Sequence, residues 1–190
     1  MEMIIEMNKS RTDRINDFQA YVDCCGLYRI IDNDVFAKIN ALGYFEAPAS
    51  TKYHLAYEGG LYEHSRNVAD ALMKFTTDNG LCWQRSQSPY IVGFFHDLCK
   101  ADQYKFNKDL NCWEYNDKTL YKGHGDKSLM LLSSILTLTD EEALCIRWHM
   151  GAFDEKENWN LYSNAIHKYP NVLWTHQADM YATHVMEVGK

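Results

Sequence analysis

The side chains of this sequence that could do chemistry are histidines and aspartates spread over most of its length. In chain order they are His64, His96, Asp97, His124, His149 and Asp179. His96 and Asp97 are adjacent and follow the apolar run YIVGFF, where a charged side chain is costly unless it is paired or bound to a metal ion. A His-Asp dipeptide alone is weak support, but its place at the end of an apolar helix is compatible with a metal site.

The order and context of these residues resemble the HD-domain phosphohydrolase superfamily. The pattern of that superfamily is a histidine, a His-Asp pair, in some members two further histidines, and a distant aspartate. The matching segments are GGLYEHSRNVADAL, GFFHDLCK, GHGDKS, IRWHMG and HQADMY, within about residues 50–187. The first of them resembles the subgroup of HD-domain exoribonucleases and small nucleotide hydrolases. Cys99 stands where the usual His-Asp-Ile-Gly-Lys has glycine, a departure that does not fall on a ligand position of the family.

The resemblance implies one or two divalent transition metal ions, drawn from Mn, Fe, Co, Ni and Zn. The metal ligands that it implies are His64, His96, Asp97 and Asp179. His124 and His149 are expected to bind a second ion, as in binuclear members, or to contact the substrate phosphate. The residue types agree with this, because neutral imidazoles and carboxylates suit these metals. A bound divalent cation lowers the pKa of its water and neutralises phosphate charge.

The residues expected to take part in catalysis are Lys100, Asp97 and Glu63. Lys100 lies three positions after Asp97 on the predicted helical face, where it could neutralise phosphate charge or pair with a carboxylate of the metal site. A solvated lysine at a helix end is the alternative. Glu63 and Asp102 are candidates for proton transfer, although Glu63 could be an ordinary first-turn glutamate. The expected substrate contacts are His124, His149, Lys122, Arg147 and Arg66.

The remaining histidines are expected to have structural roles. His176 lies three residues before Asp179 on the same helical face, so it is expected to pack beside that ligand. His54, His167 and His184 are expected to be structural or exposed, although His54 lies close to a Gly-Gly turn.

Helices must position most of these residues, because apolar side chains recur with the helical period along the chain. Helices are expected over residues 11–24, 33–42, 62–78, 88–99, 127–138, 140–150, 160–168 and 171–187. Ser88 and Asp126 are the expected caps of two of them, and Thr139 with Glu142 predicts a capping box for a third. Residues 103–116 lack the helical period and are expected to form a short β-hairpin or an irregular flap. The sequence therefore predicts an all-α bundle, and the resemblance implies that this bundle is of the HD-domain type.

The composition limits the class of protein further. A net charge of −7 disfavours a protein that coats nucleic acid through a basic face. No run approaches the ~18 apolar residues of a membrane span, and the first residues lack the basic start and long apolar stretch of a signal peptide. The cysteines form no CxxC motif, which indicates reduced thiols. We therefore expect a single cytoplasmic domain over residues 1–190 with no membrane partner; its oligomeric state is not predicted.

Together these features predict an enzyme, a metal-dependent phosphohydrolase of the nucleotidase or phosphodiesterase type. Its expected partner is a small phosphate substrate, with a nucleotide as the first candidate. Nucleic acid is a weaker candidate, because the chain has no net positive field to follow a polyanion. Two alternatives stay open: a non-catalytic regulatory module that binds metal and nucleotide, and a 3′–5′ exoribonuclease-like nuclease.

Overall fold

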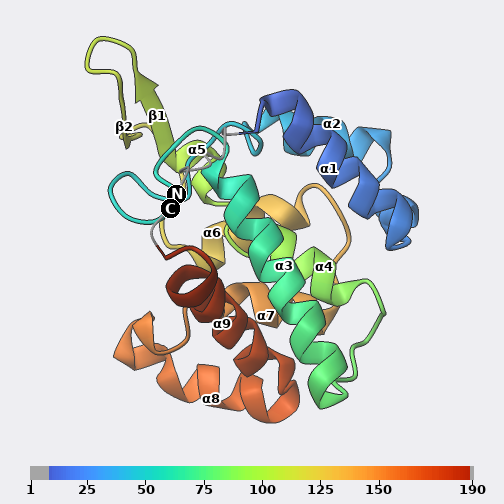
Figure 1. Ribbon diagram of the computed structural model, residues 1–190. Helices are drawn as coiled ribbons and strands as arrows, with labels where there is room; N and C mark the ends of the chain where they lie inside the picture. Colours follow the sequence, from blue (N-terminus) through green and yellow to red (C-terminus); the bar gives the residue numbers. More distant parts are fainter. Residues whose placement is uncertain (1–8, 189–190) are drawn as a thin grey trace, which may run out of the picture.

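Helices make up most of the computed structural model, which describes residues 9–188 (Figure 1). The α-helices are α1 (Arg11–Cys24), α2 (Asn33–Ala41), α3 (Gly60–Asn79), α4 (Ser88–Phe95), α5 (Lys100–Gln103), α6 (Gly125–Ser133), α7 (Asp140–Arg147), α8 (Trp159–Lys168) and α9 (Asn171–Tyr181). Short 3₁₀-helices cover Leu27–Arg29, Gly151–Phe153 and Lys156–Asn158, and a π-helix over Ala182–Met186 follows α9.

The strands β1 (Tyr104–Asn107) and β2 (Cys112–Tyr115) form an antiparallel hairpin that projects from the helical body (Figure 1). Phe106 pairs with Trp113 across the hairpin, and the two rings meet edge to face, which is a favourable cross-strand pair. The prediction of an all-α protein with a short hairpin is confirmed, and within 103–116 the hairpin is the correct alternative.

Capping interactions fix some helix starts as predicted and others differently. The capping box at the start of α7 is confirmed, because the Glu142 N–H donates to Thr139 Oγ1 at 3.2 Å and the Thr139 N–H donates to Glu142 Oε2 at 2.9 Å. The caps expected at Ser88 and Asp126 are wrong. Ser88 is the first residue of α4, and its hydroxyl donates to Glu142 Oε1 at 2.7 Å. Asp126 lies inside the first turn of α6.

Four predicted helices end earlier than expected, among them the one expected over 140–150, which ends at Arg147. The helix expected over 88–99 ends at Phe95, and a turn separates it from α5. The helix expected over 127–138 ends at Ser133, and the one expected over 171–187 becomes a π-helix after Tyr181. The His-Asp pair therefore lies in a turn after α4 rather than on its helical face.

The pairing of α3 and α4 forms the centre of the fold, and α3 also packs against α9. Gly93 of α4 lies against the backbone of Ala69 in α3, so that a Cβ atom at position 93 would overlap with Ala69. This close approach needs glycine. It brings the ends of α3 and α4 that carry His64 and His96 together, with ring centroids 5.2 Å apart.

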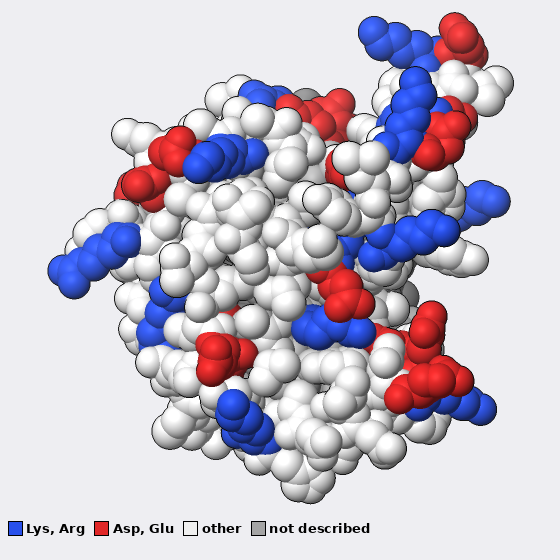
Figure 2. All heavy atoms as spheres, turned by 180° about the vertical axis from the view of Figure 1, so that it is seen from behind, with Lys and Arg blue, Asp and Glu red and all other residues white. Residues whose placement is uncertain are grey.

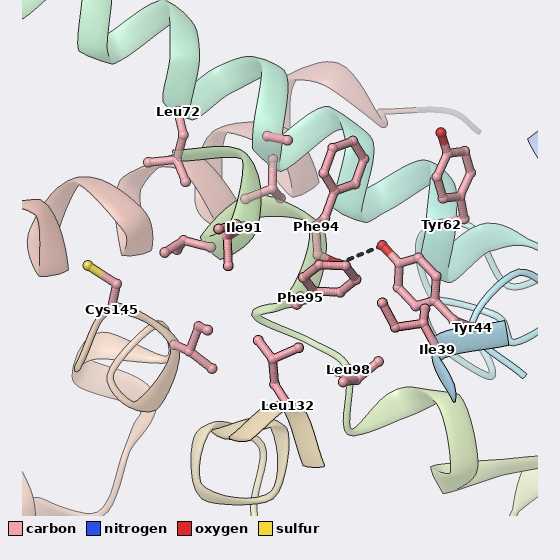
Figure 3. Close-up of a cluster of buried hydrophobic side chains, with 14 of the residues drawn as sticks. Ile39, Tyr44, Tyr62, Leu72, Ile91, Phe94, Phe95, Leu98, Leu132 and Cys145 are labelled. Atoms are coloured by element: carbon pink, nitrogen blue, oxygen red, sulfur yellow. Dashed lines mark hydrogen bonds between the residues drawn. The ribbon is translucent and has the colours of Figure 1, made fainter. Parts of the chain in front are cut away.

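A buried apolar cluster surrounds α4 and holds these helices in place (Figure 3). Phe94 and Phe95 are fully buried, and the hydroxyl of Tyr44 donates to the carbonyl of Phe94 at 2.6 Å. Leu132 from α6 and Cys145 from α7 complete the cluster. The turn after α4 is therefore anchored from both sides, which limits the movement of the residues that it carries.

The surface shows charges of both signs mixed together. On the face in Figure 2, lysine and arginine side chains alternate with aspartate and glutamate, including on the hairpin. Among the helices of residues 9–188, none has the length and apolar character that a membrane crossing needs. The first residues, on which the expectation of no signal peptide rests, fall largely outside the described range.

Candidate metal centre

Five separate parts of the fold bring the predicted ligands together. His64 lies in the second turn of α3, and His96 and Asp97 follow α4. His124 precedes α6 and His149 follows α7. These last two elements meet where Gly125 lies against the carbonyl of Arg147, so closely that a Cβ atom would not fit. Asp179 projects from α9, which packs on both α3 and α7.

Asp97 is the residue around which the others gather, and its side chain is almost fully buried. Its Oδ2 atom lies 3.7 Å from His64 Nε2, 3.6 Å from His96 Nε2 and 2.6 Å from Lys100 Nζ. Its Oδ1 atom lies 3.4 Å from His149 Nε2 and 3.8 Å from His124 Nδ1. The two carboxylate oxygens of Asp97 therefore face two different groups of side chains.

Asp179 completes the first of these groups. Its Oδ1 atom lies 3.2 Å from His64 Nε2. The donor atoms that His64, His96 and Asp179 offer all lie within 4.8 Å of one another. Bonds of roughly 2.0–2.2 Å from nitrogen and oxygen ligands to a divalent transition metal make such a group small enough for one ion. The predicted ligands His64, His96, Asp97 and Asp179 thus converge in the structure.

Backbone hydrogen bonds fix the tautomers of two of these histidines. His96 Nδ1 lies 2.9 Å from the carbonyl of Gly93, and His149 Nδ1 lies 2.7 Å from the carbonyl of Ile146. Because a carbonyl can only accept, Nδ1 carries the proton in both rings. Burial lowers the pKa of His96 to about 4, so this ring is neutral near pH 7 and its Nε2 has a free lone pair.

The Nε2 atoms of His64, His96 and His149 are buried and have no hydrogen-bond partner among the described residues. A buried polar atom without a partner is costly, and such atoms need an explanation. Histidines that bind metal typically donate their other ring N–H to a carbonyl or carboxylate, as these do. The unpartnered Nε2 atoms are therefore the atoms that a metal ion would satisfy.

Glu187 holds His64 from the side opposite the centre. Its carboxylate lies 3.1 Å from His64 Nδ1 and accepts a hydrogen bond from Asn67 at 2.9 Å. Although burial opposes it, the interactions with Asp179 and Glu187 raise the pKa of His64 to about 9. The π-helix over Ala182–Met186 directly precedes Glu187, and the backbone N–H of Glu187 donates to the carbonyl of Ala182. This helix places the Glu187 side chain beside His64. No sequence motif pointed to Glu187.

Two ionised carboxylates, those of Asp97 and Asp179, make the centre favourable for a bound cation. Burial opposes ionisation of Asp97, but Lys100 and His96 hold the pKa of its carboxyl well below the usual value. Burial likewise opposes ionisation of Asp179, whose pKa is lowered chiefly by His64. On the Oδ1 side, hydrogen bonding to Asp97 raises the pKa of His124 to about 10. Both carboxylates are thus ionised in a buried site, which stabilises positive charge there.

A cavity of about 230 Å³ opens beside this centre. Its lining residues are His54, His64, Asp97, Lys100, His124, Met150, Phe153, His176, Asp179, Met180, Thr183 and His184. Lys100 therefore reaches the cavity while it contacts Asp97, so it is not a solvated helix-end charge. A small ligand in the cavity could contact Lys100 and the carboxylates of the centre together.

Two of the other histidines have positions that differ from the expectation. His54 and His184 were expected to be structural or exposed, but both line the cavity, and His54 Nε2 lies 3.8 Å from Glu187 Oε2. His176 fits the expected packing role, because its Nδ1 donates to the carbonyl of His149 at 2.8 Å. His54 lies in an irregular turn before α3, where no repeating pattern of apolar residues indicates which way a side chain points.

Several predicted contacts do not reach the cavity. Arg147 forms ion pairs with Asp126 and, at 2.7 Å, with Asp154, and its guanidinium covers the ring of Trp148. Lys122 is exposed in the loop before α6. These two cations occupy positions that favour structural or surface roles rather than phosphate binding.

Three further charged candidates, Arg66 and Glu63 on α3 and Asp102 on α5, are also absent from the lining of the cavity. Arg66 lies 3.6 Å from Asp17 of α1, and Glu63 accepts a hydrogen bond from Tyr57 at 2.7 Å; neither lines the cavity. Asp102 forms an ion pair with the buried Lys127, a contact that the sequence did not indicate.

Comparison of the chain with protein-family models, with curated proteins and with solved structures finds no match. The functional interpretation therefore depends on the residues of the site. They define a buried His/Asp centre that could hold a divalent metal ion next to a small cavity with a lysine at its wall.

Proposed function

We propose that this chain is a metal-dependent phosphohydrolase of the HD-domain type that acts on a phosphate ester of a nucleotide. The observation that carries the proposal is the convergence of His64, His96 and Asp179 around Asp97, with imidazole Nε2 atoms that are buried and lack hydrogen-bond partners. Three of the five sequence segments that resemble the HD-domain pattern supply these same residues, so the resemblance and the geometry support one another.

The residues of the centre would hold a divalent cation in place of the proton on His64. Such a cation, when bound, supplies an activated water and neutralises phosphate charge. Glu187 orients the His64 ring, and the carbonyl of Gly93 orients His96, so both Nε2 atoms are aimed before any ligand binds. Pre-aimed ligands reduce the cost of reorganisation in the reaction.

Lys100 is the residue of the chain best placed to act on the phosphate. Although burial opposes it, the contact with Asp97 raises the pKa of Lys100, so its ammonium group stays protonated. The side chain is largely buried, yet it lines the cavity. A fixed cation at this wall would attract a phosphate oxygen and stabilise the negative charge that develops on it during hydrolysis.

Apolar residues in the lining of the cavity favour a nucleotide over a bare phosphate as the ligand. Met150, Phe153 and Met180 line the cavity, and the Phe153 side chain is mostly exposed. An exposed aromatic ring beside flexible methionines offers an apolar surface on which a base could pack. The cavity size and the net charge of −7 favour a small molecule over a polynucleotide.

The test is a phosphate-release assay on purified protein loaded with Mn²⁺, Co²⁺ or Ni²⁺, with a panel of nucleoside mono-, di- and triphosphates and cyclic nucleotides. We expect hydrolysis of at least one class by the wild-type protein and none by Asp97→Ala. Asp109→Asn, a change on the exposed tip of the hairpin, is the matched control and should retain activity. Metal-loaded wild-type protein that binds nucleotides but hydrolyses none would instead support a regulatory module.

A further inference from the structure

Cys99 lies in the same centre, on the Oδ1 side of Asp97. Its side chain is fully buried. The Sγ atom lies 3.9 Å from Asp97 Oδ1 and 3.6 Å from His124 Nδ1, and these last two atoms are 3.8 Å apart. The three atoms therefore form a nearly equilateral triangle. His64 and His96 face the other carboxylate oxygen of Asp97, Oδ2, so the two groups share only the Asp97 side chain.

The triangle is slightly larger than one face of a tetrahedral metal site. Bonds of about 2.3 Å from sulfur and about 2.0–2.1 Å from nitrogen and oxygen place the sulfur roughly 3.5–3.6 Å from the other two donor atoms, and the nitrogen and oxygen roughly 3.3–3.4 Å from each other. The observed separations are 3.6, 3.8 and 3.9 Å. The Cys99–His124 distance agrees with this geometry and the other two exceed it by a few tenths of an ångström, so a small inward movement of the side chains would let all three atoms bind one ion.

A nucleophilic cysteine is excluded by the same geometry. In a Cys-His-Asp relay the thiol and the carboxylate contact opposite nitrogens of the ring, so that a proton can pass between them. Here Cys99 Sγ and Asp97 Oδ1 both face Nδ1 of His124. Because the sulfur, the oxygen and the nitrogen all face one another, they are arranged as three ligands around an ion would be.

An independent feature beside this triangle also points to a ligand. His149 is fully buried, and its Nε2 atom lies 3.4 Å from Asp97 Oδ1 without a hydrogen-bond partner among the described residues. The Cys99 position is also fixed, because its N–H donates to the hydroxyl of Ser128 in α6 at 3.1 Å. His124 begins the same helix, so α6 holds both Cys99 and His124 in register.

We propose that Asp97 Oδ1, Cys99 Sγ and His124 Nδ1 form a second metal site with a thiolate ligand that selects Zn²⁺ over harder ions such as Mn²⁺. Binding releases two protons to solvent, one from the Cys99 thiol and one from Nδ1 of the protonated His124 ring, and the charges of the thiolate and of Asp97 balance the dication. Thiolate and imidazole together favour zinc. The cavity beside His124 leaves the remaining coordination position open. This proposal shares Asp97 with the proposed function, but it does not depend on hydrolysis.

The test is a titration of metal-free, reduced protein with Co²⁺, followed by absorption spectroscopy and metal analysis. We expect a thiolate-to-cobalt charge-transfer band in the near ultraviolet, two equivalents of bound metal, and loss of the band on addition of Zn²⁺. Cys99→Ala should lack the band and bind one equivalent. Cys145→Ala, which removes another fully buried thiol, is the matched control and should keep both.

His124→Ala decides the matter if Cys99→Ala fails to fold, because the His124 side chain is 36% exposed and its removal spares the core. This variant should bind one equivalent and show a weakened band. A wild-type protein that binds Co²⁺ without the charge-transfer band would overturn the proposal, as would a band that survives in Cys99→Ala or is unchanged in His124→Ala. Because no readout uses turnover, an absence of hydrolysis would count only against the proposed function.

Discussion

His64 Nδ1 and Glu187 Oε1 lie 3.1 Å apart, and this contact ties the segment after the π-helix to a ligand on α3. A carboxylate behind a ligating imidazole fixes the ring and strengthens the ligand. Glu187→Gln keeps the shape of the side chain but removes its charge. We expect metal affinity at the His64 site to fall about 10–100-fold, measured by competition with a chelator. Affinity equal to that of the wild type would show that Glu187 has no part in orienting His64.

Substitutions of Asp97 and of Lys100 should differ in their effects on metal content and on turnover. Asp97→Ala removes a ligand, so metal and activity should be lost together. Lys100→Ala removes a cation that cannot bind metal, so metal content should stay near the wild-type level. Turnover should fall by about 10²-fold, the scale of one lost electrostatic contact in an active site. Metal analysis paired with steady-state kinetics on the substrate found in the panel gives both numbers; full activity of Lys100→Ala would remove that residue from the mechanism.

Gly93→Ala should act on the metal site from a distance. The added methyl group would overlap with the backbone of Ala69, so α3 and α4 must separate. Overpacking of this kind costs about 1–3 kcal/mol of the free energy of unfolding, which denaturant titration measures. Because the same shift moves His64 away from His96, metal affinity should fall as well.

A second change tests the cause of that loss. Ala69→Gly, added to Gly93→Ala, removes one of the overlapping atoms but leaves the Ala69 backbone in place. We expect the double variant to recover only part of the stability and affinity. Complete recovery would mean that the backbone approach is looser than the structure shows.

Asp154 should contribute to the loss of stability in acid. Burial opposes its ionisation, but hydrogen bonds from Asn158 and Arg147 hold the pKa of Asp154 below its usual range. A lowered carboxyl pKa gives stability that is present above the unfolded value and is lost as the pH falls through the folded value. Asp154→Asn should therefore be less stable than wild type near neutral pH and show a shallower decline below about pH 4. Urea unfolding at stepped pH measures both, and parallel curves would contradict the assignment.

The sequence could predict most of the helices and several residues that come together at the candidate centre, because both depend on local patterns. The period of apolar residues and the Thr139 and Glu142 capping box located helices, and His96 with Asp97 stood out at the end of an apolar run. Cys99 and Glu187 could not be placed in the same way. Their positions depend on how a turn and a π-helix direct one side chain, and a one-residue shift in either would point that side chain elsewhere.

The cations were the least predictable part of the site. Arg147 and Lys100 are alike in sequence terms, since each is a cation close to one of the candidate histidines. The structure pairs Arg147 with Asp126 and Asp154, whereas Lys100 reaches the cavity. Tertiary packing between distant elements decides which carboxylate a long side chain contacts. The sequence alone does not predict that choice.

The contact between His64 and Glu187 joins residues that are 123 positions apart. Closing so long a loop costs entropy, so this contact forms more slowly than the local contacts within α3 or α4. An ion that binds only the closed arrangement draws the chain toward it by mass action. Metal supply would then set how much of this protein is folded, as well as how much of it is loaded.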